Sequence, residues 1–110
     1  MNKLTMRDRF NAKNAGEKPD AYIGQVITAV ALGEFMDNVT DMETGEVTEK
    51  PISVIVTKDN HTITSPSATL NKALNDLIAL CEDEKLKEID IKLAHGTSNA
   101  GRKFLTIMLA

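Results

Sequence analysis

The sequence predicts a mainly β domain with a single helix. Three observations predict it: five segments rich in β-branched residues are separated by turn residues, one segment alone has helical periodicity, and that segment follows the third strand. This order is the element order of a five-stranded OB-like Greek-key barrel with one helix between strands 3 and 4. An α+β domain, with one helix packed on an antiparallel sheet, has the same order and is the alternative.

Length and composition indicate one small domain. The chain has 110 residues, of which 42% are apolar, and it contains three phenylalanines, one tyrosine and no tryptophan. A chain of this size buries a smaller fraction of its surface than a larger one, so we expect modest stability. The single cysteine, Cys81, cannot form an internal disulfide, and no apolar run approaches the roughly 20 residues of a membrane span. We therefore expect a cytoplasmic protein without a membrane segment.

Charge is distributed unevenly along the chain. The net charge is −3, but residues 1–18 hold five basic and two acidic residues, which leaves eight basic and 14 acidic residues in the other 92. The basic end has little apolar periodicity. We predict a flexible basic N-terminal arm over residues 1–20 and an OB-like domain over residues 21–110. The net charge argues against bulk electrostatic binding of duplex DNA but leaves room for a local basic groove.

The first strand is predicted over residues 22–35, which are rich in β-branched side chains. Gly24 within this segment favours a bulge, and a bulge allows a sheet to curl into a small barrel. Residues 37–50 are acidic and contain Gly45 in a turn pattern that accepts positive φ. We expect a mobile acidic loop there, which faces away from nucleic acid or contacts basic protein partners.

A β-hairpin is predicted over residues 52–65. The first strand opens at Pro51, and its apolar side chains alternate onto one face, as in a half-buried strand. Asp59 and Asn60 form a tight-turn signal, and residues 61–65 supply the short third strand.

The segment with helical periodicity comes next. Its apolar residues recur at the i, i+3, i+4 and i+7 spacing of a helix with one buried face. They are Leu70, Ala73, Leu74, Leu77, Ile78 and Cys81. Ser65 or Ser67 is a suitable N-cap, and the acidic residues 82–84 mark the end of the helix. Cys81 lies on the apolar stripe, so we interpret it as a small buried hydrophobe.

Two more strands complete the predicted sheet. Residues 88–94 alternate between apolar and polar side chains, which is typical of a half-buried strand. Residues 95–101 form a turn-rich connection, and residues 102–109 form the last strand.

The last hairpin resembles one in a known family. Residues 96–106 read Gly-Thr-Ser-Asn-Ala-Gly-Arg-Lys-Phe-Leu-Thr. Together with the hairpin at residues 54–60, they are similar to small single-stranded DNA-binding proteins of tailed bacteriophages, in which a strand ends in a Thr-Ser/Lys-small-Gly-Arg-aromatic turn. The resemblance covers residues 21–110 in motif spacing and element order, and the basic arm lies outside it. It implies a replication or recombination accessory protein that coats exposed single strands without reading their sequence.

Non-specific binding of a single strand requires cations near phosphates and flat side chains that stack on bases. Few aromatics are present, so charge must carry most of such binding. On the last strand, Arg102 and Phe104 are expected to share a face and Lys103 to point the other way. A strand phenylalanine more often packs inward, whereas Tyr22 is amphipathic and lies at a strand start. The candidate nucleic-acid-binding residues are Tyr22, Lys58, His61, Lys92, Arg102, Lys103 and Phe104.

The sequence contains no recognisable arrangement of catalytic residues. His61 and His95 are 34 positions apart, and no pair of cysteines or histidines has metal-ligand spacing. We therefore expect no enzyme, no metal and no cofactor. The expected partners are single-stranded DNA, with RNA left open, replication proteins and a second copy of the chain. The alternative function is a small structural or adaptor protein that self-associates through a sheet edge.

Overall fold

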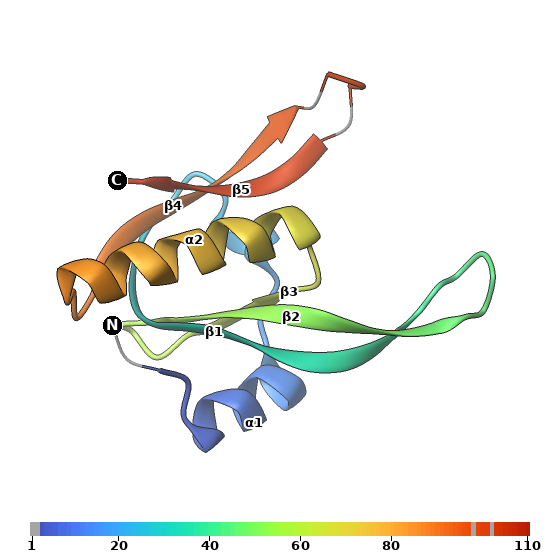
Figure 1. Cartoon of the computed structure of the whole chain (residues 1–110), viewed down its shortest axis with the longest axis horizontal. Helices are drawn as coiled ribbons and strands as arrows, with labels where there is room; N and C mark the ends of the chain where they lie inside the picture. Colours follow the sequence, from blue (N-terminus) through green and yellow to red (C-terminus); the bar gives the residue numbers. More distant parts are fainter. Residues whose placement is uncertain (1–2, 98, 102) are drawn as a thin grey trace.

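The structure, a computed structural model, describes residues 3–97, 99–101 and 103–110 (Figure 1). The elements follow the chain in the order α1 (Met6–Ala15), the short 3-10 helix η1 (Pro19–Tyr22), β1 (Val26–Thr40), β2 (Val47–Thr57), β3 (Thr62–Ser65), α2 (Ala68–Glu84), β4 (Ile89–Thr97) and β5 (Lys103–Leu109). The prediction of five strands with the main helix between the third and fourth is confirmed. Within the described part of the chain, no helix is long and apolar enough to cross a membrane.

The five strands form one antiparallel sheet in the order β3-β2-β1-β4-β5. The arrangement is OB-like, but the sheet is not closed, because β3 and β5 are its two edges. β1 pairs with β4 over its first four residues and with β2 from Ala29 onward, and the register shifts between Ala29 and Ala31. This bulge allows one strand to serve two differently oriented wings of the sheet. Gly24, where we expected the bulge, instead has a φ of 81° in the turn before β1.

α2 lies between the two wings of the open sheet, with β4 and β5 on one side and β1, β2 and β3 on the other (Figure 1). It packs against β1, β2 and β5. Its buried residues are Leu70, Leu74, Leu77 and Cys81, which confirms the predicted stripe and the buried cysteine. Of the two predicted caps, Ser67 is the one that the helix uses: its side chain accepts a hydrogen bond from the Leu70 amide. Because the edge strands do not pair, this apolar contact holds the two wings together.

The acidic segment at residues 37–50 is mostly strand, not the loop that we expected. β1 continues to Thr40 and β2 begins at Val47, with Met36 opposite Pro51 and Thr40 opposite Val47. Only residues 41–46 turn, and Gly45 there has the predicted positive φ, 72°. Figure 1 shows this hairpin projecting from the rest of the molecule. Its acidic composition indicated a loop, but the cross-strand backbone bonds extend the ladder regardless of side-chain type.

The N-terminal segment also differs from the arm that we expected, because residues 6–15 form α1. A reciprocal capping box starts the helix: the Asp8 amide donates to the Thr5 hydroxyl at 3.1 Å, and the Thr5 amide donates to the Asp8 carboxylate at 2.9 Å. α1 packs against β2 and β3 and buries Ala12. A Cβ on Gly16 would lie 2.6 Å from both the Ala12 carbonyl and the Thr64 hydroxyl, so this close approach requires glycine.

Candidate nucleic-acid interface

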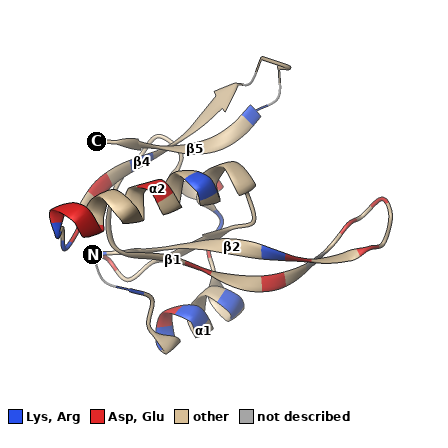
Figure 2. Cartoon of the chain, in the orientation of Figure 1, with Lys and Arg blue, Asp and Glu red and all other residues tan. Residues whose placement is uncertain are grey.

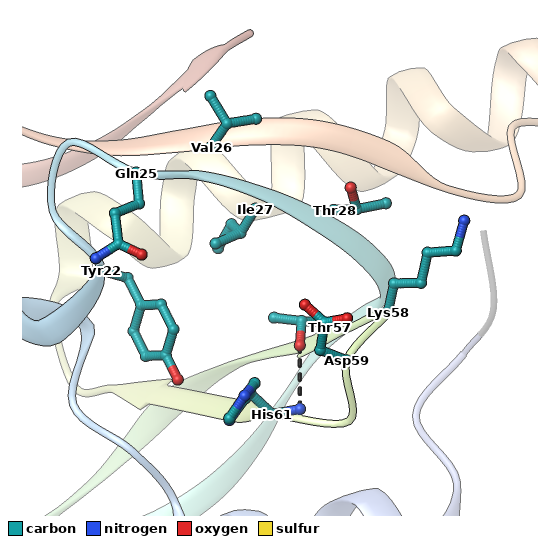
Figure 3. Close-up of a pocket in the computed structure, with 9 residues that line it drawn as sticks. All are labelled: Tyr22, Gln25, Val26, Ile27, Thr28, Thr57, Lys58, Asp59 and His61. Carbon is teal, nitrogen blue, oxygen red and sulfur yellow. Dashed lines mark hydrogen bonds between the residues drawn. The ribbon is translucent and has the colours of Figure 1, made fainter.

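A pocket opens where β1 separates from β2 (Figure 3). Before Ala29, β1 pairs with β4, whereas β2 continues into the β2–β3 turn. The gap has a volume of about 290 Å³, and we call it the turn pocket. Its lining residues are Tyr22, Gln25, Val26, Ile27, Thr28, Thr57, Lys58, Asp59 and His61. Three residues predicted to bind nucleic acid, Tyr22, Lys58 and His61, thus come together from η1 and the β2–β3 turn.

Hydrogen bonds donated by two backbone amides fix the position of the β2–β3 turn. Asn60 adopts a φ of 67°, which asparagine tolerates better than most residues, at the tight turn that the sequence predicts. The His61 amide donates to the Thr57 hydroxyl at 3.0 Å, as drawn in Figure 3. The Lys58 amide donates to the Thr28 carbonyl at 2.9 Å, so the turn remains tied to β1 across the pocket.

Glu17 organises the aromatic end of the turn pocket. The Tyr22 hydroxyl donates to one Glu17 carboxylate oxygen at 2.8 Å, and His61 Nδ1 lies 2.9 Å from the other. The two rings are tilted by 59° with centroids 6.0 Å apart. The hydrogen bond from Tyr22 first, and that from His61 second, lower the pKa of Glu17, while burial and the Glu17 bond raise the pKa of Tyr22. Glu17 is therefore charged and Tyr22 neutral at physiological pH.

Glu17→Gln is expected to lower stability slightly at neutral pH and to have no such effect in acid. The folded-state pKa of Glu17 is below the ordinary value of 4.5, so its stabilising contribution is complete above that pH and disappears as the pH falls through the lowered pKa. The side chains of His61 and Glu17 are 50% and 41% exposed, so the difference in the free energy of unfolding between the wild type and Glu17→Gln is under about 1 kcal/mol. Thermal unfolding of the wild type and of Glu17→Gln measures this difference in stability. The pH range is 3–7, which spans about four units around the ordinary Glu pKa. Asp59→Asn is the control, and an equal pH dependence for both variants would contradict the prediction.

Lys58 lies at the opposite end of the turn pocket from Tyr22 (Figure 3). Its Nζ is 3.6 Å from a Glu88 carboxylate oxygen, and the two side chains are 66% and 48% exposed. An exposed pair of this kind is weak in water. Lys58 can therefore exchange Glu88 for a phosphate at little cost.

The outer face of β4 and β5 continues from the turn pocket. Lys92 stands opposite Val26, so both side chains lie on one face. Ala94 and Gly96 follow on that face, and the Phe104 ring covers Gly96 so closely that a Cβ there would collide with it. We call this surface the β4–β5 outer face, made up of Val26, Lys92, Ala94, Gly96, Phe104 and Thr106. From Lys92 to Gly96 it extends roughly 13 Å at ~3.3 Å per residue.

The last hairpin agrees with the prediction in part. Lys103 and Phe104 alternate, so Lys103 points to the other face, as expected. Phe104 is half-buried against Gly96 and is not part of the core around α2, whereas we expected inward packing. Glycine at position 96 leaves room for the ring on the outer face. Arg102 lies outside the described residues.

Charge separates the molecule into distinct regions (Figure 2). Acidic residues gather along the β1–β2 hairpin and at the end of α2, while α1 carries several basic residues. Among the described residues, neither acidic region lines the turn pocket.

Glu17 is a residue of the candidate site that sequence reasoning missed, and it contacts both Tyr22 and His61. It lies in the basic segment, and its role depends on a parallel bridge to Ile63 that places it beside His61. A glutamate in a polar stretch gives no local signal of such a contact.

Comparison with known proteins gives a consistent result. Residues 5–110 match the model of a family described as phage single-stranded DNA-binding protein. The single-stranded DNA-binding proteins of Bacillus phages PZA and phi29 are each 30% identical over 106 residues, which is 92% of this chain and 82% of theirs. No solved structure matches the chain. The match begins at residue 5 and so includes α1, which corrects the expectation that the similarity starts at residue 21. The chain belongs to the phage single-stranded DNA-binding protein family.

Proposed function

We propose that this protein binds single-stranded DNA without sequence preference and supports phage DNA replication or recombination. The observation that carries the proposal is the turn pocket, where the Tyr22 ring from η1 and the imidazole and lysine of the β2–β3 turn line one pocket at an end of the β4–β5 outer face. Membership of the family supports the choice of ligand. The activity is binding without a catalytic step, and it takes place in the host cytoplasm.

In this proposal the strand lies in the turn pocket and along the β4–β5 outer face. Tyr22 beside the turn pocket and Phe104 at the far end of the β4–β5 outer face offer ring faces or edges to bases, and stacked bases contribute about 1–3 kcal/mol each. Lys58, beside Glu88, contacts a phosphate at the opposite end of the path from Phe104, and Lys92 contacts one between Lys58 and Phe104. Stacking and phosphate contacts both tolerate any base, so this arrangement favours binding without sequence preference.

Affinity for oligo-dT is expected to fall steeply as salt rises. Each neutralised phosphate of a single strand contributes about −0.7 to the slope of log K against log salt, so two or three contacts give a slope of roughly −1.4 to −2.1. Fluorescence anisotropy of a labelled oligo-dT across a salt series measures the slope. Absence of binding at low salt would overturn the proposal, and a parallel series with oligo-U decides whether RNA binds equally well.

The adaptor function remains the second candidate because β5 is an edge strand with exposed Met108 and Leu109. Self-association through this edge would form a homo-oligomer without DNA. Light scattering with and without oligonucleotide separates the two functions, since an adaptor assembles in both samples. Replication proteins are the further partners that a strand-coating protein meets.

A further inference from the structure

A second pocket shares the β2–β3 turn with the turn pocket. It lies between α1 and the turn, has a volume of about 400 Å³, and we call it the α1 cleft. Its lining residues are Arg7, Asp8, Asn11, Val56, Asn60 and Thr62. Along the hairpin, Thr57 and His61 line the turn pocket, whereas their neighbours Val56 and Thr62 line the α1 cleft. Because side chains alternate across strands, the two pockets lie on opposite faces of the hairpin end and meet at its tip.

The basic side chains beside the turn differ in whether they face a carboxylate. Lys58 faces Glu88, and His61 faces Glu17. Asp8 in the α1 cleft is held by the capping box with Thr5. Among the residues that the structure describes, the Arg7 side chain is exposed and has neither an ion pair nor a hydrogen bond. Arg7 therefore supplies a cation at the turn that no described carboxylate neutralises. The neighbouring Asp8 carboxylate accepts a hydrogen bond from the Thr5 amide at the N-terminus of the helix.

The lining of the α1 cleft fits a phosphate better than a base. An arginine, two asparagines and a threonine supply hydrogen-bond donors, and guanidinium matches phosphate geometry with two parallel bonds. None of the described residues that line the cleft is aromatic, so they offer no stacking surface.

We propose that a bound single strand crosses the tip of the β2–β3 turn from the turn pocket into the α1 cleft, where Arg7 contacts a backbone phosphate. This inference rests on the proposed function, because it extends the path of the same strand. In this arrangement α1, which replaces the flexible arm predicted from the sequence, forms one wall of the path of the DNA strand. Strand length beyond the turn pocket then adds affinity through charge alone.

Arg7→Ala tests the inference, with Arg9→Ala as the matched control, because Arg9 is an exposed arginine of the same helix that does not line the cleft. Both changes are expected to preserve folding, because each replaces an exposed helical residue with a good helix former. The chain has one tyrosine and no tryptophan, so intrinsic fluorescence reports Tyr22 in the turn pocket. Two oligo-dT lengths are compared: the shortest that changes Tyr22 fluorescence, and one several nucleotides longer.

Arg7→Ala is expected to leave the short oligonucleotide unaffected and to weaken binding of the long one by about tenfold at low salt, the range of a hydrogen bond to a charged group. The salt slope for the long strand should fall by about 0.7. Arg9→Ala should retain the wild-type slope, and Arg7→Lys should restore it. Equal losses in Arg7→Ala and Arg9→Ala, or no loss in either, overturn the inference. If oligo-dT of no length binds the wild-type protein at low salt, the proposed function is overturned instead.

Discussion

Tyr22→Ala is expected to weaken binding of oligo-dT by between about fivefold and 100-fold, the loss of one stacked base. Tyr22 is the aromatic residue of the turn pocket beside His61, and the hydroxyl bond to Glu17 fixes its ring. No phenylalanine is among the described residues that line the pocket, and the neighbouring His61 ring offers a smaller stacking surface than the phenol. Anisotropy of a labelled oligonucleotide gives the affinity, since the variant has lost its intrinsic fluorophore.

Tyr22→Phe is the matched control, because it keeps the ring and removes only the bond to Glu17. It should bind within a few-fold of the wild type if stacking is the main contribution. Tyr22 also packs against the core, so thermal unfolding of both variants must accompany the titration. A Tyr22→Phe protein as weak as Tyr22→Ala would show that the hydroxyl network, and not the ring, determines affinity.

Leu74→Ala is expected to destabilise the fold by about 2–5 kcal/mol, the usual cost of a large-to-small change in a core. Leu74 is 1% exposed on the face of α2 that packs under the open sheet. Because β3 and β5 do not pair, the contacts of α2 replace the hydrogen bonds that would close a barrel. Urea denaturation measures the difference in the free energy of unfolding.

Leu80→Ala serves as the comparison on the same helix. Leu80 is 60% exposed, so its truncation should change the free energy of unfolding by less than about 0.5 kcal/mol. Similar changes in the free energy of unfolding for Leu74→Ala and Leu80→Ala would mean that α2 does not pack against the sheet through the face that carries Leu74. Loss of DNA binding in Leu74→Ala at temperatures where it stays folded would further show that α2 sets the spacing of the two wings.

Local pattern was enough to predict the elements with strong periodicity. The i, i+3, i+4 spacing from Leu70 to Cys81 predicted α2, and the turn signal at Asp59 and Asn60 predicted the β2–β3 hairpin. The acidic hairpin was predicted wrongly, because composition says little about a ladder formed by backbone groups. α1 was missed for a related reason: its residues are mostly polar, and its packing depends on Gly16 meeting Thr64.

The candidate site was predicted residue by residue, but not as an arrangement. Tyr22, Lys58 and His61 were chosen for their chemistry, and the structure places them around one pocket. Lys92 and Phe104 join them through the outer face of β4 and β5, while Lys103 points away. That these residues bind DNA stays a prediction, which the variants above test.

The sequence by itself determined the order of elements, the buried face of α2 and the chemical types available for binding. These follow from periodicity and composition, which act over a few neighbouring residues. The tertiary structure decided that β1 changes partners at the bulge after Ala29 and that Glu17 contacts both Tyr22 and His61. It also decided that residues of the β2–β3 turn line both the turn pocket and the α1 cleft. Each of these depends on contacts between residues far apart in the chain, and local pattern does not encode such contacts.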